Sequence, residues 1–437
     1  MQTRTFRGGV HPDGSKLSAE SALQVLPPPG EVSIPLKQHI GIAVQPLVKV
    51  GDVVCLGQKI GDSDQGLCAP VHASVSGRVK AIQAVDSADG RTVQAIILEN
   101  DGEDRLDDSV HPLDNWASLP PAELKGLIRE AGIVGMGGAG FPTHAKLSVP
   151  EGKKLSVLII NGVECEPYLT GDHRILLEYA SRVLLGIKVL MRAATVEKAY
   201  IGVKVTMAGI PAAFESLLHN EPGVDLVLLE SKFPQGEERQ LVYAITEQEI
   251  PSSGLPWDVG ALVCNASTAW AIGTYIETGM PSIERPVTVT GAVKNPSNFL
   301  TRIGTPIKYL IEHAGGFEGE PGTVIMGGPM TGLPQVSLNT TICKQNNGVL
   351  VFTKQQMKKV RETDCIRCGK CVEVCPWRLM PIYMAKESQR EDVSQMQHYN
   401  ILDCRECGSC AYTCPARIPL LHWIRLGKGL VQAARRG

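Results

Sequence analysis

The cysteines near the end of the chain constrain its fold more than any other feature. Eight of the thirteen cysteines form two copies of the run C-x2-C-x2-C-x3-C-P. The copies are Cys365, Cys368, Cys371 and Cys375, then Cys404, Cys407, Cys410 and Cys414. Three thiolates at this spacing wrap one face of an iron–sulfur cubane, and the run is typical of bacterial ferredoxins with two [4Fe-4S] clusters. Zinc, the alternative, usually takes two separated C-x2-C pairs.

The fourth ligand of each cluster has to come from elsewhere, because the chain cannot close around the far corner of the cubane so quickly. In two-cluster proteins it comes from the other copy. We therefore expect cluster 1 to be bound by Cys365, Cys368, Cys371 and Cys414, and cluster 2 by Cys404, Cys407, Cys410 and Cys375. Such clusters transfer single electrons. The scattered cysteines are expected to be small buried residues: Cys55, Cys68, Cys165, Cys264 and Cys343.

Composition narrows the class of protein further. A net charge of -2 argues against nucleic-acid binding. The clustered cysteines suit a reducing compartment, and the N-terminus lacks the apolar segment of a signal peptide. No run approaches the roughly 18 apolar residues of a membrane span. We therefore expect a cytoplasmic protein, with docking on a membrane complex left open.

Residues 1–100 are expected to form a small β domain. Short β-like runs alternate with glycine turns over residues 31–82. The pattern VKVGDVVCLGQKIG…APVHASVSGRV resembles the barrel-sandwich hybrid of lipoyl and biotinyl domains, whose carrier lysine stands on a hairpin tip. Here the tip, residues 62–66, has no lysine, and Lys59 falls in the preceding strand. We therefore expect a barrel without a carrier lysine.

Residues 118–280 alternate helix and strand, the pattern of an α/β layer domain. Helices are predicted at 121–132 and 210–220, with one long amphipathic helix at 174–194. Strands are predicted at 153–162, 198–204 and 224–230.

The rest of the chain divides into two units and a tail. Residues 285–350 are rich in β-like runs around one helix and resemble the β-grasp module called SLBB. Residues 356–425 form the cysteine-rich unit, and residues 426–437 a tail. Over 418–437 the chain is both apolar and basic, so Leu420, Trp423, Ile424 and Leu430 offer a docking face. The alternative is a helix that packs on the cluster domain.

A glycine-rich loop occupies residues 132–147, GIVGMGGAGFPTHAKL. It satisfies G-x-G-x-x-G, but a helix precedes it, which disfavours a Rossmann site. It is not a P-loop either, because no Gly-Lys-Ser/Thr closes it. Its glycines still allow backbone amides to approach an anionic or aromatic ligand closely. Pro142 can begin a helix at its first position, with Lys146 one turn inside.

Three further loops carry polar residues next to predicted strands: NGVECEPYLTGDH (161–173), FPQGEERQL (233–241) and LVCNASTAWAIG (262–273). Glu164 and Glu166 would point to the same side if their loop is extended. Each loop alone is typical of an ordinary strand-to-helix connection. Four such loops at successive strand ends predict a shared ligand site, because α/β sheets bind ligands beyond their strand ends.

At this point the chain resembles a known family. GMGGAGFPTHAK, NGVECEP, QGEERQ and CNAST, in this order, resemble the FMN and NADH site of the flavoprotein subunit of respiratory complex I. With TFRGGVHPDGSK at the start, the barrel, the SLBB segment and the twin cysteine runs, the whole chain resembles the C subunit of the Rnf electron-transport complex. This implies a multidomain α/β and α+β protein: a barrel-sandwich hybrid, a complex-I-flavoprotein-like α/β FMN domain, an SLBB β-grasp domain and a C-terminal α-helical two-cluster ferredoxin domain.

The resemblance also implies site residues. The FMN is expected to be held by Gly135, Gly137, Gly138, Lys146, Asn161, Glu164, Gly236, Glu237, Glu238, Asn265 and Thr268. NADH is expected to meet Phe141, by stacking on adenine, and Glu166, through its hydroxyls. Three positions depart from the complex I pattern: Met136 replaces an arginine, Val163 an aspartate and Cys264 an asparagine.

The implied activity is that of an ion-translocating NADH:ferredoxin oxidoreductase subunit. NADH gives two electrons as hydride while a cluster accepts one, and an FMN between them resolves the mismatch. No general acid or base is assigned. The implied partners are NADH and the membrane subunits that translocate Na+ or H+, with ferredoxin indirectly. Two alternatives stay open. The cobalamin reductase of bacterial microcompartments shares the flavin and cluster modules but begins near the glycine loop. A ferredoxin-like module would carry clusters without flavin.

Overall fold

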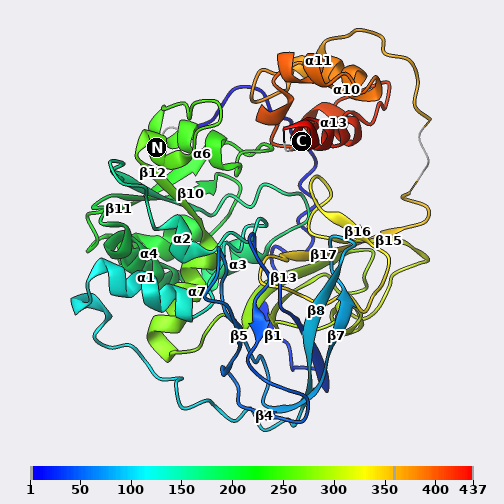
Figure 1. Ribbon diagram of the computed structural model, residues 1–437. Helices are drawn as coiled ribbons and strands as arrows, with labels where there is room; N and C mark the ends of the chain where they lie inside the picture. Colours follow the sequence, from blue (N-terminus) through cyan, green and yellow to red (C-terminus); the bar gives the residue numbers. More distant parts are fainter. Residues whose placement is uncertain (1–2, 358–360, 436–437) are drawn as a thin grey trace.

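The chain folds into four units in sequence order, as a computed structural model describes for residues 3–357 and 361–435 (Figure 1). A β barrel, an α/β layer domain and a second β domain pack together, and the C-terminal helices form a further body at one end of the molecule (Figure 1). Among the described residues, none of the helices combines the length and the apolar character that a bilayer crossing requires.

The barrel consists of two small antiparallel sheets that enclose one apolar core. Its strands are β2 (Glu31–Pro35), β3 (Gln45–Pro46), β4 (Val53–Val54), β5 (Lys59–Asp62), β6 (Val71–His72), β7 (Gly77–Asp86) and β8 (Thr92–Asn100). The strand orders are β2-β8-β7-β4 and β3-β5-β6. Val32, Ile60 and Leu98 are fully buried between them. The predicted barrel-sandwich fold is confirmed.

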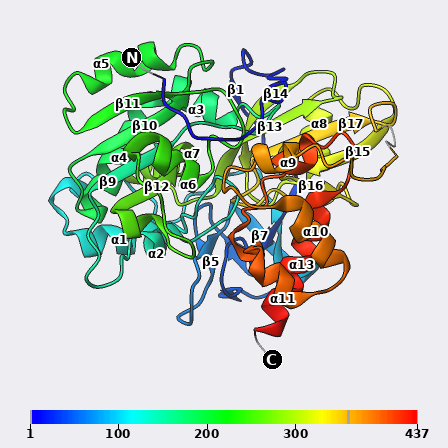
Figure 2. The same ribbon diagram turned by 90° about the horizontal axis from the view of Figure 1, so that it is seen from above.

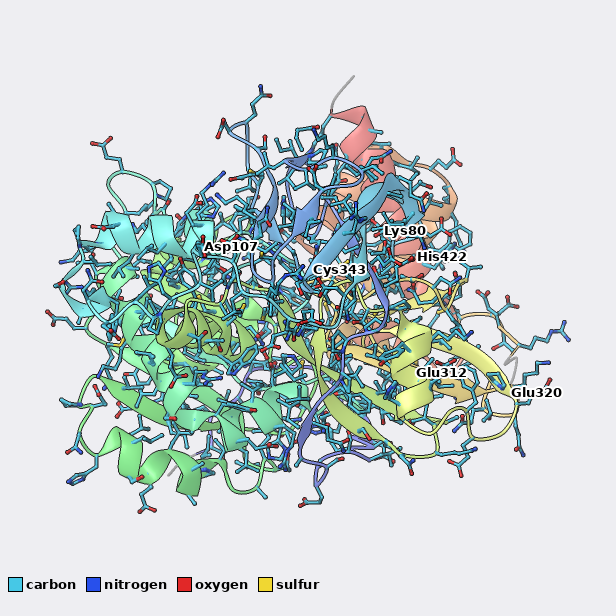
Figure 3. All side chains as sticks on the ribbon, turned by 90° about the horizontal axis from the view of Figure 1, so that it is seen from below. Lys80, Asp107, Glu312, Glu320, Cys343 and His422 are labelled. Carbon is cyan, nitrogen blue, oxygen red and sulfur yellow. The ribbon has the colours of Figure 1, made fainter. Side chains whose placement is uncertain are left out.

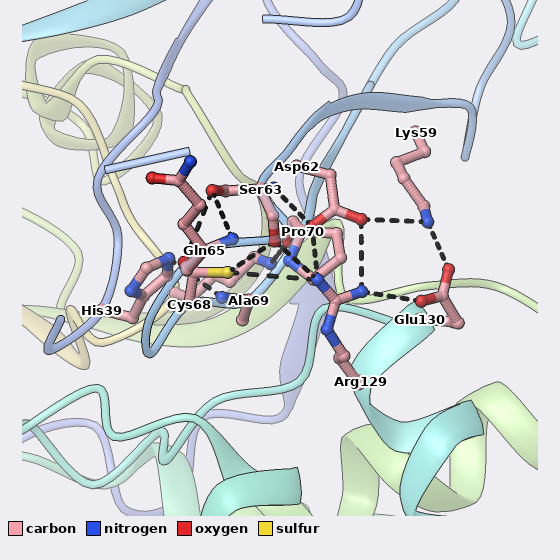
Figure 4. Close-up of polar contacts among 11 residues, drawn as sticks. His39, Lys59, Asp62, Ser63, Gln65, Cys68, Ala69, Pro70, Arg129 and Glu130 are labelled. Carbon is pink, nitrogen blue, oxygen red and sulfur yellow. Dashed lines mark hydrogen bonds and ion pairs between the residues drawn. The ribbon is translucent and has the colours of Figure 1, made fainter. Parts of the chain in front are cut away.

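Lys59 is not a free carrier arm (Figure 4). Its ammonium group bonds the carboxylates of Asp62 and of Glu130, the last residue of helix α1 (Pro121–Glu130). Arg129 of the same helix grips Asp62 with both guanidinium nitrogens, at 2.8 and 3.2 Å. Figure 4 shows this network where the barrel meets the helix, so the hairpin that would carry a cofactor serves as a domain contact.

The α/β domain has a parallel sheet of strand order β11-β10-β9-β12. The strands are β9 (Val157–Asn161), β10 (Ala199–Lys204), β11 (Val224–Leu229) and β12 (Ala261–Asn265). Around it lie α1, α2 (Thr143–Lys146), α3 (Gly171–Glu178), α4 (Ala180–Ala194), α5 (Ile210–Leu218), α6 (Glu238–Thr246) and α7 (Ala266–Thr278), with single turns η1 (Trp116–Ser118) and η2 (Pro256–Val259). The register places Asn161 beside Asn265 at the carboxyl end of the sheet.

The predicted single helix over residues 174–194 is wrong. The chain forms α3 and α4 instead, with a break at Tyr179, whose backbone is not helical (φ -124°, ψ 32°). The segment contains no proline, and its apolar periodicity runs through the break, so nothing local marks it. The break lets α3 begin at Gly171, earlier than predicted, and point its first turn toward the loop that ends β9.

The second β domain is a six-stranded sheet of order β1-β14-β13-β17-β15-β16 beside α8 (Ile307–His313). Its strands are β13 (Glu284–Gly291), β14 (Ser297–Arg302), β15 (Pro321–Met326), β16 (Leu333–Gln335), β17 (Gly348–Thr353) and the N-terminal β1 (Leu23–Val25). Glu312 and Glu320 of this domain and Lys80 of the barrel are exposed, and Cys343 is buried; all four are labelled in Figure 3. Cys68, Cys264 and Cys343 are buried as expected, whereas Cys55 and Cys165 are half-buried.

The C-terminal domain consists of short helices around the two cysteine runs: α9 (Lys370–Glu373), α10 (Pro381–Gln389), α11 (Val393–His398), η3 (Ile401–Asp403), α12 (Ser409–Tyr412) and α13 (Leu420–Ala434). Leu420 and Ile424 of α13 are buried in the core of this domain. Helix α13 therefore packs on the cluster domain, which was the alternative to a docking face, and its apolar face is not free. Helix α13 also continues through the boundary expected at residue 425.

Residues 3–25, which we call the N-terminal arm, lie outside the barrel. Arg4 pairs with Leu229 at the end of β11, and Val10 pairs with Phe233. Further along, β1 joins the edge of the second β domain beside β14. Figure 2 shows this dark blue segment along the outer side of the molecule rather than within the barrel.

Candidate functional site

One large cavity, of about 1200 Å³, lies beyond the carboxyl ends of β9 and β12. Of the residues predicted to hold FMN or NADH, all but Glu164 line it: Gly135, Gly137, Gly138, Phe141, Lys146, Asn161, Glu166, Gly236, Glu237, Glu238, Asn265 and Thr268. The four loops predicted to share a ligand site therefore meet at one place. Its position agrees with the rule that α/β sheets bind ligands beyond their strand ends.

The glycine-rich loop forms one wall of the cavity as a tight turn. The amide of Gly135 donates to the carbonyl of Phe141 at 2.8 Å, and that of Gly140 donates back to Gly135. Gly138 has a φ of +126°, a conformation that favours glycine. A Cβ atom at Gly137 would lie 3.3 Å from the Cβ of Asn265. The loop thus presents backbone atoms rather than side chains to the cavity. Such a wall suits a large planar or anionic ligand, because backbone amides can approach it closely.

Two asparagines set the polar floor of the cavity. Asn161 donates to the carbonyl of Gly236 at 2.7 Å, which joins the end of β9 to the loop before α6. The side-chain oxygen of Asn265 accepts from the amides of Ser267 and Thr268 and so caps helix α7. Thr268 in turn accepts from the amide of Met136 at 2.9 Å. These hydrogen bonds therefore link the glycine-rich loop, the end of β9 and the start of α7.

Charged groups flank this floor. Lys146, in the last turn of α2, forms an ion pair of 2.5 Å with Glu238. Glu237 caps α6 by accepting from the amides of Arg239 and Gln240. Burial raises the pKa of the Glu237 carboxyl to about 7. Pro142 caps α2 rather than starting it, so the helix begins one residue later than predicted.

The two glutamates of the NGVECEP loop do not point to the same side, so that prediction is wrong. Glu164 has a left-handed backbone (φ +43°), which breaks the extended geometry. Its carboxylate turns away from the cavity and accepts from the amides of Asp172 and His173 at the start of α3. Glu166 reaches the cavity, where its carboxylate accepts from the amide of Met330 at 3.0 Å and from the Thr331 hydroxyl. Burial raises the pKa of Glu166.

The three residues that depart from the complex I pattern lie in two kinds of place, the domain core and the cavity wall. Met136 and Val163 are fully buried and face the domain core, away from the ligand side. Cys264 lines the cavity next to Asn265. The chain therefore replaces two polar side chains of the complex I pattern with core residues, and only the third replacement changes the cavity wall.

The sequence did not reveal the wall opposite the four loops. Lys37 and His39 of the barrel, and Gln345 of the second β domain, line the cavity together with Trp257. His39 is neutral, because burial lowers its pKa to about 4, and its Nε2 accepts from the amide of Ala69. Arg405 is the residue of the described C-terminal domain that lines the cavity. Domain packing brings these residues together, so no local signal marks them.

The neighbours of two cluster cysteines can be read from what shifts their pKa. Burial raises the pKa of the Cys410 thiol, and the neighbouring thiols of Cys407, Cys404 and Cys375 raise it further. Burial also raises the pKa of Cys371, and its thiol neighbours are Cys414 and Cys365. The Cys375 thiol is thus near thiols of the second run, and the Cys414 thiol is near thiols of the first; the ligand set of each cluster stays a prediction. Within the described residues no group of metal-ligating side chains converges tightly enough for a single ion; a cubane holds its ligands on separate corners.

The two cysteine runs have the same backbone shape. Left-handed residues recur at equal offsets: Arg367 and Glu406, Gly369 and Gly408, Arg378 and Arg417. The amides of Leu379 and Glu406 approach the sulfurs of Cys375 and Cys404 at 3.4 Å. Amide-to-sulfur contacts stabilise a negatively charged cluster and tune its potential. Donor set, spacing and backbone all fit two [4Fe-4S] clusters.

Fold and cavity together define a class: a flavin-binding iron–sulfur electron-transfer protein with a flavin domain of the complex I type. Residues 128–274 match the family model of the Nuo51 FMN-binding domain, and residues 357–415 match that of the 4Fe-4S dicluster domain. Residues 286–334 match the SLBB domain. Residues 4–103 match the RnfC barrel sandwich hybrid domain.

The chain belongs to the RnfC family, the C subunits of the ion-translocating ferredoxin:NAD+ oxidoreductase (Rnf) complexes. It is 43% identical over 434 residues to the C subunit of the Na+-translocating ferredoxin:NAD+ oxidoreductase complex of Acetobacterium woodii, and the match covers 99% of this chain and 98% of the relative. Identity to the proton-translocating counterpart of Clostridium ljungdahlii is 44%, over 91% and 88% of the two chains. Identity to the C subunit of the ion-translocating oxidoreductase complex of Rhodobacter capsulatus is 37%, over 98% and 83%.

These comparisons confirm the predicted family, the fold class and the presence of flavin and cluster domains. They favour the Rnf interpretation over the microcompartment cobalamin reductase, because the barrel segment that separates the two matches the RnfC barrel sandwich hybrid model.

Proposed function

We propose that this chain is the NADH-oxidising subunit of an Rnf-type complex and passes electrons from NADH through FMN and two [4Fe-4S] clusters to partner subunits. The observation that carries this proposal is the cavity itself, where the glycine loop, Asn161, Asn265 and Glu238 converge beyond the sheet. When bound, FMN supplies the exchange between two-electron and one-electron chemistry.

The residues of the chain bind and orient. The glycine loop, Lys146, Asn161 and Asn265 would hold the FMN, with Thr268 at its phosphate end. Phe141 and Glu166 would bind NADH at the side of the cavity closed by the second β domain. Glu164 contributes indirectly in this proposal, because its carboxylate holds the start of α3 and not the cavity wall.

Cluster 2 is the nearer acceptor in this scheme. Arg405, between its ligands Cys404 and Cys407, lines the cavity. Glu237 also lines the cavity, and its charge is among the smaller causes that raise the pKa of the Cys407 thiol, so Glu237 lies near that cysteine. Cluster 1 then lies beyond, where Cys368 is exposed at the surface. This order supports electron flow from the cavity to cluster 2, then cluster 1, then a partner.

The partners follow from the family. Subunits of a membrane complex would take the electrons at the cytoplasmic face and couple their transfer, between NADH and ferredoxin, to Na+ or H+ translocation. The chain would be peripheral there.

Anaerobic titration of the chain, loaded with iron, sulfide and FMN, tests this function. NADH is expected to bleach the flavin absorbance and then the cluster absorbance. Absence of flavin bleaching would overturn the NADH-oxidising function. Glu166→Ala is expected to weaken NADH binding while the cluster absorbance stays intact, with exposed Glu103→Ala as the matched control. Unchanged NADH kinetics in Glu166→Ala would remove that residue from the site.

A further inference from the structure

The segment TFRGGVHPDGSK takes no part in the cavity wall, although it belongs to the motifs that mark the family. In the structure it forms the first part of the N-terminal arm. In Figure 1 the dark blue trace passes from the α/β domain to the C-terminal domain before it turns to the β domains. The arm therefore touches both units between which electrons have to move.

Two consecutive backbone amides of the arm point to different domains. The amide of Gly9 donates to the carbonyl of Val374 at 2.8 Å, next to Cys375 of cluster 2. The amide of Val10 donates to the carbonyl of Phe233 at 2.8 Å, and the amide of Phe233 donates back to Val10 at 2.8 Å. Phe233 begins the loop that carries Gly236 and Glu237 into the cavity. Two neighbouring residues, Gly9 and Val10, thus join the chain next to Cys375 to the loop that begins at Phe233.

Both glycines are needed for this close approach. Gly9 has a φ of +81°, and a Cβ atom there would lie 2.7 Å from the carbonyl oxygen of Phe233. Gly8 has a φ of +75°, and its Cβ would lie 3.0 Å from the carbonyl oxygen of Val374 and 3.2 Å from the carbonyl carbon of Cys375. A side chain at either position is strained and pushes the backbones apart.

A buried lysine secures the arm on the flavin side. The ammonium group of Lys232, the residue before Phe233, donates to the carbonyl of Phe6 and lies 4.1 Å from the centre of the Phe6 ring. Lys232 is 8% exposed. A buried cation held by a carbonyl and an aromatic face fixes the arm more firmly than exposed contacts would.

We propose that the N-terminal arm, through Gly8, Gly9 and Val10, is a positioning element that holds cluster 2 against the flavin loop and so sets the rate of electron transfer from flavin to cluster. The inference rests on the proposed function. Electron transfer slows steeply as donor and acceptor separate. Hydride transfer from NADH depends on the cavity alone, which Gly8, Gly9 and Val10 do not line. The contact of Gly8 and Gly9 with the cluster loop therefore acts on the second step.

Stopped-flow mixing of the FMN- and cluster-loaded full chain with NADH separates the two steps. In Gly8→Ala, whose methyl group meets only Val374 and Cys375, the rate of flavin bleaching is expected to match the wild type. In Gly9→Ala, whose methyl group meets Phe233, the rate of cluster reduction is compared with the rate of flavin bleaching of the same variant. The rate of cluster reduction is expected to fall by about tenfold, because Gly9→Ala disrupts the hydrogen bonds with Phe233 and Gly8→Ala disrupts the one with Val374. Gly14→Ala is the matched control: a Cβ there meets only the Lys16 side chain, at 3.7 Å.

Amide hydrogen exchange provides a readout without turnover. The amides of Gly9, Val10 and Phe233 are expected to exchange faster in both variants than in Gly14→Ala. If Gly8→Ala loses cluster 2 because its methyl group meets Cys375, Gly9→Ala still tests the proposal, since its methyl group meets only Phe233 and Phe6.

The outcomes separate the two proposals. If NADH does not bleach the flavin of the wild-type chain, the proposed function is overturned. If NADH reduces the flavin and then the clusters of the wild type, and the clusters of Gly9→Ala are reduced equally fast, the positioning role is overturned. This holds whether the amides of Gly9, Val10 and Phe233 exchange faster or stay protected.

Discussion

The side-chain amide of Asn265, the last residue of β12, donates a hydrogen bond of 2.7 Å to the carboxylate of Asp172 in the first turn of α3. Asp172 also accepts from the hydroxyl of Ser267, so it holds two residues at the start of α7. It is half-buried, and desolvation raises its pKa to about 6, with the charge of Glu164 as the next cause. Asp172 does not line the cavity, yet it fixes a residue that does.

Replacing Asp172 with alanine is therefore expected to weaken FMN binding. Asn265 and Ser267 lose their common acceptor, and a hydrogen bond to a charged group contributes about 1.5–3 kcal/mol, which corresponds to a roughly tenfold to hundredfold higher Kd. Quenching of flavin fluorescence measures the affinity. Asp114→Ala, at an exposed position, is the control. An FMN affinity equal to that of the wild type would show that Asp172 does not orient Asn265.

Lys16 is expected to support the NADH side of the cavity. Its ammonium group donates to the carbonyls of Glu164, Glu166 and Leu169, and so holds the loop that presents the Glu166 carboxylate. Lys16→Met removes all three donors. We expect about a tenfold weaker binding of NAD+ by calorimetry, with FMN affinity retained. Exposed Lys49→Met should bind NAD+ normally, and an unchanged affinity in Lys16→Met would contradict this role.

The proposed crossed ligation of the clusters predicts which single-cysteine variants should resemble each other. Cys375→Ala and Cys404→Ala should both lose cluster 2, and their remaining electron paramagnetic resonance signals should match. Cys414→Ala and Cys365→Ala should both lose cluster 1 and share the other signal. The reason is the placement of Cys375 with the second run and of Cys414 with the first. Matching spectra for Cys375→Ala and Cys365→Ala would instead show that each run binds its own cluster.

Lys344 gives stability a pH dependence. It is fully buried, donates to the carbonyls of Pro70 and Gly132, and so joins three domains. Burial lowers its pKa to about 7, whereas an unfolded lysine titrates near 10.4. Between these values the unfolded chain binds more protons, so the free energy of unfolding rises with pH, by at most about 1.4 kcal/mol per pH unit.

Thermal unfolding at pH 7 and pH 9 checks this sign. The Tm of the wild type should increase more between the two pH values than the Tm of Lys344→Met. Burial also lowers the pKa of Lys16, but Lys16 is present in both proteins, so it does not affect the difference between their Tm changes. Exposed Lys294→Met should behave like the wild type. Equal pH responses of the wild type and Lys344→Met would contradict the effect of burial on Lys344.

The sequence allowed much of the cavity to be predicted, because Asn161 and Asn265 follow strands and strand ends meet at one edge of a parallel sheet. Glu164 was placed wrongly because a left-handed residue reverses the side that alternation predicts. The break at Tyr179 has no local signal. His39 and Arg405 were missed because they come from other domains, whose packing no periodicity encodes.

The pairing of β1 with β14 has a consequence for biosynthesis. Leu23 is aligned with Asn298, so the first strand to leave the ribosome waits for a partner made much later. At about 5–20 residues per second, that interval lasts roughly 15 to 55 seconds. During this time the arm has no sheet to join, and the exposed edge of a nascent chain is open to wrong pairing. Yield of folded protein should therefore respond to chaperones that protect the emerging N-terminus.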